Sequence, residues 1–291
     1  MKLPPELLRH LENAHGAVVA SSSVGGGCIS NTAKLEFASG ERVFLKWAPS
    51  TEHPPELFSE EVRSLRTIAD TRTVRVPDVV EQEHTAGFAW LMLEWLEPGP
   101  RTAGSQATLG EQLAAMHRNS AEAFGWASNN FIGSLPQSNR KHDRWFEFWR
   151  DERLLPQIEH VDRQLGVANR KRLERVIEQS ADLLEAIESE GPSLLHGDLW
   201  GGNLHTLADG TPALVDPSSY YGHREVDLAM SRLFGGFSQE FYRSYQHAWP
   251  SKEGLEQRLL VYQLYYLLVH VNLFGSGYVS QTMSVVAHLG C

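Results

Sequence analysis

The stretch LLHGDLWGGN, residues 194–203, places a histidine, an aspartate, a tryptophan and an asparagine among three glycines, directly after an apolar pair. The glycines around Asp198 favour a loop, and Leu194 and Leu195 are typical of a buried strand that leads into it. Asp198 and Asn203 are five residues apart on this loop. A carboxylate and a carboxamide so placed raise the question of which chemistry they serve.

Length and composition limit the answer. A chain of 291 residues is long enough for two domains or lobes. With 42% hydrophobic and 21% charged residues and no low-complexity tract, it has the composition of a globular protein rather than a disordered one. The formal net charge of −10 argues against nucleic acid as the main partner, because binding to phosphate backbones depends on patches of Lys and Arg.

The chain also has no pattern that we interpret as a membrane or export segment. Prolines and charges occupy the first residues, where an export signal has its apolar core. The most apolar run, residues 259–274, contains polar residues and is shorter than the ~20 residues of a membrane span, so we interpret it as a core helix. Two cysteines, Cys28 and Cys291, make neither a disulfide framework nor a metal motif. We therefore expect a cytoplasmic protein without a membrane partner, monomeric or at most a weak dimer.

Strand patterns dominate the first third of the chain, and helical patterns dominate the remainder. The predicted strands are residues 17–23, 33–39, 41–47, 76–82 and 88–96. The predicted helices are residues 54–69, 108–119, 143–160 and 169–189, with further helical segments after residue 225. Residues 97–100, EPGP, are typical of a linker, and residues 203–216 of a short hairpin.

This order of elements predicts an α+β fold with the bilobal layout of protein kinases. We expect an N-lobe over residues 1–96, with a small antiparallel five-stranded sheet and one main helix. We expect a larger helical C-lobe over residues 97–291, which carries the loop at Asp198.

Three features of the N-lobe suit a nucleotide. Gly25, Gly26 and Gly27 lie between the first two strands, where backbone amides could close over phosphates, although such a triplet is also common in plain hairpins. Lys46 lies mid-strand among bulky apolar residues and needs a negative partner or an exposed edge. Glu61 lies in the apolar stripe of the predicted helix at 54–69 and needs a cation.

We therefore predict a Lys46–Glu61 ion pair that holds an ammonium over nucleotide phosphates. Glu60 points about 100° away from Glu61 on the same helix and is predicted to lie on the solvated face.

The C-lobe loop supplies the remaining parts of a phosphoryl-transfer site. Such a site needs a carboxylate near the acceptor hydroxyl, and oxygen ligands for Mg²⁺. Asp198 and Asn203 have the D-x-x-x-x-N spacing of a kinase catalytic loop, and Asp216 ends the strand pattern PALVD just beyond the hairpin. Each residue alone is ambiguous, because aspartate and asparagine are common in turns. Together with Lys46 and Glu61 they favour a kinase.

The same residues carry a family resemblance. HGDLWGGN, followed by VDPSSYYGHREVDLAMSRLFGGF at residues 215–237, resembles the signature of the fructosamine-3-kinases, or ketosamine kinases, of the protein-kinase-like and aminoglycoside-phosphotransferase-like superfamily. The resemblance extends over nearly the whole chain. It includes GGGCIS at 25–30, LGEQLAAMHR at 109–118, FGWASNNFIGSLPQ at 124–137 and LVHVNLFGSGY at 268–278.

The resemblance implies ATP-dependent phosphorylation of the sugar 3-hydroxyl of a ketosamine, free or protein-bound, with an unstable product that releases the amine. Carried over, Asp198 would be the catalytic base, Asn203 and Asp216 would bind Mg²⁺, and Lys46, paired with Glu61, would contact phosphate. The backbone of Glu94 and Leu96 would meet the adenine edge. Asp227 is expected to be structural, accepting hydrogen bonds from the backbone of the catalytic loop.

Departures from protein kinases predict a small acceptor. Gly197 stands where protein kinases have the Arg of H-R-D, and only ten residues separate Asp216 from Asp227, too few for a long activation segment. Trp200 is placed to lie against a sugar ring. His270 is a further candidate wall of the pocket. The same holds, with core packing as the favoured alternative, for four more aromatic residues: Trp145, Trp149, Tyr220 and Tyr221.

Two other functions remain open from the sequence. Another small alcohol, such as an aminoglycoside or choline, could use the same machinery. A nucleotide-binding protein without catalysis is disfavoured by the intact set of polar residues. Cys28 in the glycine-rich loop could be a redox site, but a small residue that fits a tight loop is the favoured interpretation.

Overall fold

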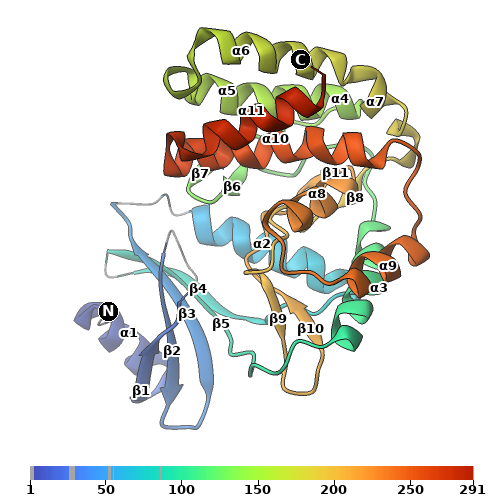
Figure 1. Ribbon diagram of the computed structural model, residues 1–291. Coiled ribbons are helices and arrows are strands. Elements are labelled where there is room, and N and C mark those ends of the chain that lie inside the picture. The colour runs from blue at the N-terminus through green and yellow to red at the C-terminus, as the bar shows by residue number, and fades with distance from the viewer. Residues whose placement is uncertain (1–2, 26–29, 52–53, 55, 86, 291) are drawn as a thin grey trace.

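The computed structural model describes residues 3–25, 30–51, 54, 56–85 and 87–290, which form two lobes (Figure 1). The smaller lobe contains a five-stranded antiparallel sheet in the order β1-β2-β3-β5-β4. Its strands are β1 Val18–Ser23, β2 Asn31–Phe37, β3 Arg42–Pro49, β4 Val79–Thr85 and β5 Phe88–Glu94. The predicted sheet is thereby confirmed.

A helix that the sequence prediction omitted covers the outer face of this sheet. It is α1, Pro5–His15, which begins with proline in its first turn. Leu7 and Leu11 of α1 are fully buried against Leu45 and Trp47 of β3. The smaller lobe therefore has a hydrophobic core of its own, on the side of the sheet away from the larger lobe.

The inner face of the sheet carries the predicted main helix, α2, Glu56–Thr71. Because side chains alternate along a strand, Phe44 and Lys46 of β3 point to the side opposite Leu45. On this inner side Lys46 meets α2, as the sequence pattern indicated.

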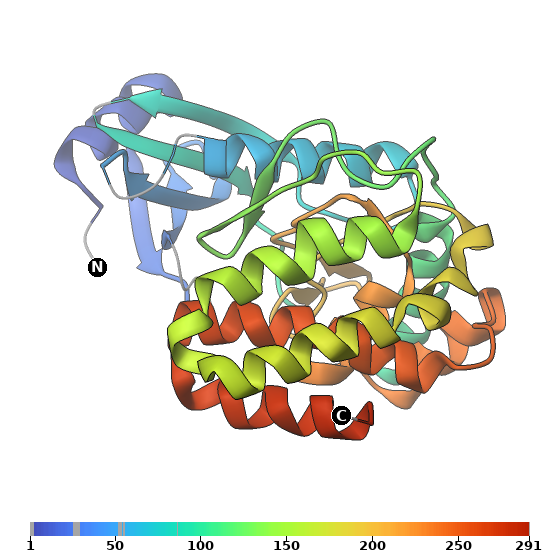
Figure 2. The same ribbon diagram turned by 90° about the horizontal axis from the view of Figure 1, so that it is seen from above.

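The larger lobe is mainly helical, and in Figure 2 its long helices lie beside one another, away from the sheet. Its α-helices are α3 Ala103–His117, α4 Trp145–Phe148, α5 Leu155–His160, α6 Asp162–Gln179, α7 Ala181–Glu185, α8 Glu225–Phe234, α9 Gln239–Ala248, α10 Leu255–Phe274 and α11 Val279–His288. Its short strands are β6 Asn130–Ile132, β7 Leu135–Gln137, β8 Ser193–Leu194, β9 Leu204–Thr206, β10 Pro212–Leu214 and β11 Tyr221–Gly222.

Several predicted helices differ in detail from the observed ones, and the one at 169–189 is divided at Ser180 between α6 and α7. Helix α3 begins five residues before the predicted start at 108, because Thr102 and Ser105 form a reciprocal capping box. The predicted helix 143–160 is interrupted by a π-helical segment, Trp149–Leu154. This segment carries Arg153, which is fully buried.

Helix α10 is the predicted core helix. Its central residues are buried on nearly all sides, and Tyr262, Tyr265 and Tyr266 are among the largest fully buried side chains. Within the described part of the chain, no helix combines the length and the apolar character needed to cross a bilayer.

The segment between the lobes is fixed to the hairpin β9–β10. Ala208 N–H donates to the Glu97 carbonyl at 3.0 Å, and Gly99 N–H donates to the Thr206 carbonyl at 2.7 Å. On the other side of the hairpin, Leu214 N–H donates to the Arg75 carbonyl at 2.9 Å. The hairpin that leads from Asn203 to Asp216 is therefore bonded to residues next to β4 and to the segment that follows β5.

Candidate active site

The loop His196–Asn203 follows β8, and one buried carboxylate binds the backbone at its start. Asp227 of α8 accepts hydrogen bonds from the backbone N–H groups of His196 at 2.8 Å and Gly197 at 2.9 Å. Tyr266 of α10 donates its hydroxyl to the Gly197 carbonyl at 2.8 Å. The predicted structural role of Asp227 agrees with these contacts.

His196 orients the start of the loop from within. Its Nε2 lies 3.0 Å from the Val215 carbonyl, and the backbone N–H of Asp198 donates to its Nδ1 at 3.3 Å. Burial lowers the pKa of His196, so the ring is neutral and carries its proton on Nε2. His196 therefore links the start of the loop to Val215, which follows β10 and precedes Asp216.

Three glycines meet at the far end of the loop. Gly201 N–H donates to the Gly235 carbonyl at 2.9 Å. A Cβ at Gly236 would lie 2.4 Å from the Gly201 Cα, so the two backbones are in contact with no room for a side chain. Arg101 donates to the carbonyls of Gly201 and Gly236 at 3.2 and 3.1 Å. The end of α8 is thus fixed beside Trp200.

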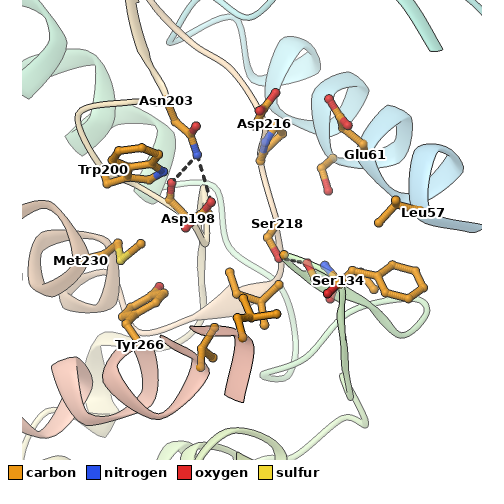
Figure 3. A pocket seen from close by; sticks show the side chains of 18 of the residues that line it. Leu57, Glu61, Ser134, Asp198, Trp200, Asn203, Asp216, Ser218, Met230 and Tyr266 are labelled. Atoms are coloured by element: carbon orange, nitrogen blue, oxygen red, sulfur yellow. Dashed lines mark hydrogen bonds between the residues drawn. The ribbon is translucent and has the colours of Figure 1, made fainter. Parts of the chain in front are cut away.

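Asp198 and Asn203 are brought together as predicted. Asn203 Nδ2 donates to the Asp198 carbonyl at 2.9 Å and to Asp198 Oδ2 at 3.0 Å, drawn as the dashed lines between Asn203 and Asp198 in Figure 3. Burial, with the negative charge of Asp216 nearby, raises the pKa of Asp198 to about 7. A carboxyl group with this pKa is poised for proton transfer near neutral pH.

On the side of the site opposite Asp198, Lys46 lies between the carboxylates of Glu61 and Asp216. Its Nζ lies 2.7 Å from Glu61 Oε1 and also contacts Asp216 Oδ1. Burial by itself would lower the pKa of Lys46, but the charges of Asp216 and Glu61 outweigh it and raise the pKa, so the ammonium stays charged. The predicted Lys46–Glu61 pair is confirmed, and Asp216 completes it.

The oxygens of Asn203 and Asp216 fit a hard cation. Because Nδ2 of Asn203 points to Asp198, its Oδ1 is the atom available for a ligand, and Asp216 offers a carboxylate. No three Asp, Glu, His or Cys side chains converge on a metal site among the described residues. These two ligands suit Mg²⁺, which commonly takes one or two protein carboxylates and fills its shell with phosphate and water.

The prediction for Glu60 was wrong. Its side chain is buried, accepts a hydrogen bond from Ser128 Oγ at 2.7 Å and lies 3.3 Å from Arg63 Nε. The reason is that residues 128–137 of the larger lobe lie against this face of α2, and helical periodicity within α2 cannot reveal that.

The structure describes only some of the residues that were predicted to bind the nucleotide. Gly26 and Gly27, like Cys28, lie outside the described residues. Glu94 N–H donates to the Asp78 carbonyl at 2.9 Å, so a base could meet Glu94 only at its carbonyl. The Leu96 carbonyl accepts from His205 Nε2 at 3.0 Å, which ties this segment to β9. Gly25 is described as a bend after β1.

A cavity of about 560 Å³ joins these groups. Asp198, Trp200, Met230 and Tyr266 lie on one side of it and Glu61, Leu57 and Ser134 on the other, with Asp216 and Ser218 between them (Figure 3). Trp200 is 36% exposed, which is unusual for so large an apolar ring and leaves its surface available to a ligand.

His270 lines the same cavity from α10. Its ring stacks on Phe234, with centroids 4.3 Å apart, and its Nδ1 lies 2.8 Å from the Tyr266 carbonyl. Burial lowers the pKa of His270, so the ring is neutral, donates through Nδ1 and keeps Nε2 as an acceptor. Trp145, Trp149 and Tyr220 are fully buried core residues, in agreement with the favoured interpretation.

One wall of the cavity was not predicted from the sequence. It is the hairpin β6–β7, where Phe131 of β6 and the turn residues Gly133 and Ser134 line the space opposite Trp200. The signal was a Gly-Ser pair between two short apolar segments in the stretch FIGSLPQ, which is typical of a hairpin.

Comparison with known proteins agrees with this geometry. The family model described as fructosamine kinase matches residues 3–290. The mouse protein named ketosamine-3-kinase is 35% identical over 312 residues, which cover 98% of this chain and 99% of the mouse protein. A solved structure from Thermobifida fusca, of a fructosamine-3-kinase candidate, is 32% identical with a TM-score of 0.86, and the match covers 97% of this chain and 98% of that one.

More distant solved structures share the fold alone. A macrolide 2′-phosphotransferase from Brachybacterium faecium is 16% identical with a TM-score of 0.61, covering 98% of this chain and 97% of that one. The family model spans nearly the whole sequence, and the two lobes, the Lys46–Glu61 pair and the Asp198 loop are all present. The chain therefore belongs to the fructosamine kinase family.

Proposed function

We propose that this protein is an ATP-dependent kinase that phosphorylates the 3-hydroxyl of a ketosamine sugar. The observation that carries the proposal is one cavity that contains Asp198, with its raised pKa, opposite the ammonium of Lys46 and the oxygens of Asn203 and Asp216. The name of the mouse relative supports the substrate class. Release of the amine from the phosphorylated product, and hence deglycation, is the role that follows.

In this proposal the chain is divided as its lobes suggest. Residues 1–96 hold the nucleotide, with Gly25 to Gly27 over the phosphates and the backbone of Glu94 and Leu96 at the adenine. Residues 97–291 hold the catalytic loop and the acceptor. Lys46 turns its ammonium to the phosphates, and Glu61 keeps it oriented.

Asp198 acts as the general base in this reaction. It accepts the proton of the sugar hydroxyl while the hydroxyl oxygen forms a bond to the γ-phosphorus, and the bond from that phosphorus to the bridging oxygen breaks to release ADP. Asn203 holds the Asp198 carboxylate in place through the 3.0 Å hydrogen bond. Mg²⁺, bound by Asn203 Oδ1 and Asp216, would neutralise charge on the phosphates.

The acceptor lies, in this proposal, between Trp200 and His270. Trp200 offers an apolar face for a sugar ring, and Nε2 of the neutral His270 can accept a hydrogen bond from a sugar hydroxyl. The short segment from Asp216 to Asp227 leaves this space for a small group, either a free adduct or one carried on a protein side chain.

The test is ADP release from Mg-ATP with a panel of fructosamine, ribulosamine, aminoglycoside and choline acceptors. The panel is run with the wild-type protein and with Asp198→Asn, which should keep nucleotide binding and lose about 10²–10⁴-fold in rate. Turnover restricted to the ketosamines supports the proposal. Turnover with aminoglycosides or choline alone would refute the substrate class, and full activity of Asp198→Asn would refute the role of Asp198.

A further inference from the structure

A buried cluster of amide side chains lies behind the segment that carries Asp216, and the proposed reaction uses none of its members. The cluster consists of Asn130, Gln137 and Asn139, which are 2–3% exposed, and of the fully buried Arg153. Asn130 and Gln137 come from the hairpin β6–β7, and Arg153 comes from the π-helical segment.

Arg153 determines how the amides are oriented. A guanidinium can only donate hydrogen bonds, so the Asn139 atom 2.6 Å from Arg153 Nη2 must be the oxygen Oδ1. Nδ2 of Asn139 then donates to Asn130 Oδ1 at 2.8 Å and to the Ser128 carbonyl at 3.0 Å. The Arg153 guanidinium thus determines that Asn139 accepts through Oδ1 and donates through Nδ2 to Asn130.

Asn130 and Gln137 in turn donate hydrogen bonds to Ser219 and Ser218, which follow Asp216. Asn130 Nδ2 donates to the Ser219 carbonyl at 2.9 Å. Gln137 Nε2 donates to Asn130 Oδ1 at 2.8 Å and to Ser218 Oγ at 3.2 Å, while Tyr265 donates its hydroxyl to Gln137 Oε1 at 2.5 Å. Every polar side-chain atom of Asn130 and Gln137 therefore has a hydrogen-bond partner. If the O and N atoms of either amide were exchanged, two donors or two acceptors would face each other.

Asp216 needs such support because its backbone is in the left-handed region, with φ of +56°. That conformation is unfavourable for a non-glycine residue and persists only where the surroundings hold it. Ser218, two residues later, is held by its N–H to the His196 carbonyl at 2.8 Å and by Gln137 at its hydroxyl.

The hairpin region also holds α2. Ser128 Oγ donates to Glu60 Oε2 at 2.7 Å, and Ser219 N–H donates to Ser64 Oγ of α2 at 3.3 Å. In Figure 2 the green segment that includes β6 runs alongside the light-blue helix α2, and β6 and α2 are in contact. The cluster consequently joins both elements whose carboxylates, Glu61 and Asp216, bind Lys46.

We propose that Asn130 and Gln137 are positioning residues for phosphoryl transfer, which hold the Asp216 segment and α2 in one geometry. In protein kinases the corresponding Lys–Glu pair and metal-binding Asp are put in place through a phosphorylated activation segment. This chain has only ten residues between Asp216 and Asp227, and the hairpin β6–β7 with Arg153 behind it provides a permanent support instead.

The test compares two buried glutamines. Gln137→Met keeps the size of the side chain and removes its hydrogen bonds. Gln157→Met is the matched control, because Gln157 is also buried and its Oε1 accepts from Asn272 Nδ2 at 2.6 Å, between α5 and α10. Hydrogen exchange of the protein without nucleotide is measured over residues 216–220 and 56–71, together with thermal unfolding.

Gln137→Met should exchange faster in both segments, whereas Gln157→Met should exchange there like the wild type, even when both lose similar thermal stability. If Gln137→Met does not fold, Tyr265→Phe, which removes only the hydroxyl that holds Gln137 Oε1, should show the same faster exchange. Unchanged exchange in the variant that folds would overturn the inference, because the cluster would then be ordinary core packing.

The kinetic part of the test rests on the proposed function. Gln137→Met should lower kcat or raise the Mg²⁺ concentration for half-maximal rate by about 10–100-fold, as loss of a group that orients a metal ligand does. Gln157→Met should change neither. Equal effects of the two variants would contradict the positioning role. If the wild type turns over no acceptor, the proposed function fails, while the exchange measurement still decides the role of the hairpin.

Discussion

Asp198 is the proposed general base, and its environment predicts a pH profile. Burial and the charge of Asp216 raise the pKa of Asp198 to about 7, so the base is increasingly protonated below neutral pH. We expect kcat/KM to fall about tenfold per pH unit below pH 7 and to level off above it. A steady-state profile from pH 5.5 to 9 checks this. A profile that is flat across pH 7 would contradict the assignment of Asp198 as the base.

The same pKa predicts an effect on stability. The pKa of Asp198 is raised from 3.8, its ordinary value, to about 7 in the folded protein, so the folded state binds the proton more tightly than the unfolded state. This contribution is fully present below pH 3.8 and is lost as the pH rises through 7. Without nucleotide or Mg²⁺, Asp198→Asn should therefore melt at a higher temperature than the wild type at pH 8.

The difference in Tm between Asp198→Asn and the wild type should shrink as the pH is lowered from 8 to 5, where the wild-type carboxyl is protonated. Each kcal/mol corresponds to about 2–4 °C in a protein of this size class. Equal melting temperatures at pH 8, measured by calorimetry, would show that the carboxylate is not destabilised in its site.

At the scale of elements, the catalytic loop depends on Gly197. Its φ is +84°, and a Cβ at this position would lie 2.0 Å from the Ser218 carbonyl oxygen. Gly197→Ala should therefore displace the Asp216 segment and remove most activity. Gly191→Ala is the matched control: its φ of +72° and ψ of −179° are also reserved for glycine, but nothing lies within 4 Å of its Cβ, so it should cost only about 1–3 kcal/mol of backbone strain.

Activity assays with thermal melts separate the two glycine variants. Gly191→Ala should keep its rate, while Gly197→Ala should lose rate as well as more stability. Similar rates in the two variants would mean that the contact between Gly197 and Ser218 is not needed for the geometry of the site.

The elements show how far the sequence can predict this molecule. The strand pattern around Lys46 and the apolar stripe of α2 correctly predicted the Lys46–Glu61 pair, because both patterns are local. Glu60 was placed wrongly, because the segment that buries it, around Ser128, is nearly seventy residues away in the chain. Helix α1 was missed, since its two buried leucines are intelligible only once the outer face of the sheet is known.

The residues of the candidate site were also predictable because their spacing along the chain is a local pattern. Spacing places Asp198 and Asn203 on one loop, and the hairpin turn brings Asp216 back beside them. The hairpin at Gly133 and Ser134 has a local sequence signal, but its place in the wall of the cavity could not be predicted, because that depends on the buried amides around Arg153, which show no periodic pattern. The roles assigned to Trp200, His270, Glu94 and Leu96 stay predictions.

For the whole molecule, the account requires that the two lobes bind nucleotide together. Mg-ADP at 100 times its Kd should stabilise the protein by about 2.7 kcal/mol, and raise Tm by about 5–10 °C. Lys46→Met should abolish most of this shift because it removes the cation at the phosphates. Lys252→Met, at an exposed lysine, is the control and should keep the shift. An unchanged shift in Lys46→Met would contradict the role of Lys46.

The most direct test of the central claim is the position of the phosphate in the product. The wild-type protein is incubated with Mg-ATP and a fructosamine or ribulosamine, and the product is examined by phosphorus and proton NMR. We expect one phosphate ester, coupled to the proton on C3 of the sugar, which disappears as free amine is released. A phosphate on another hydroxyl, or no ester with any ketosamine, would contradict it.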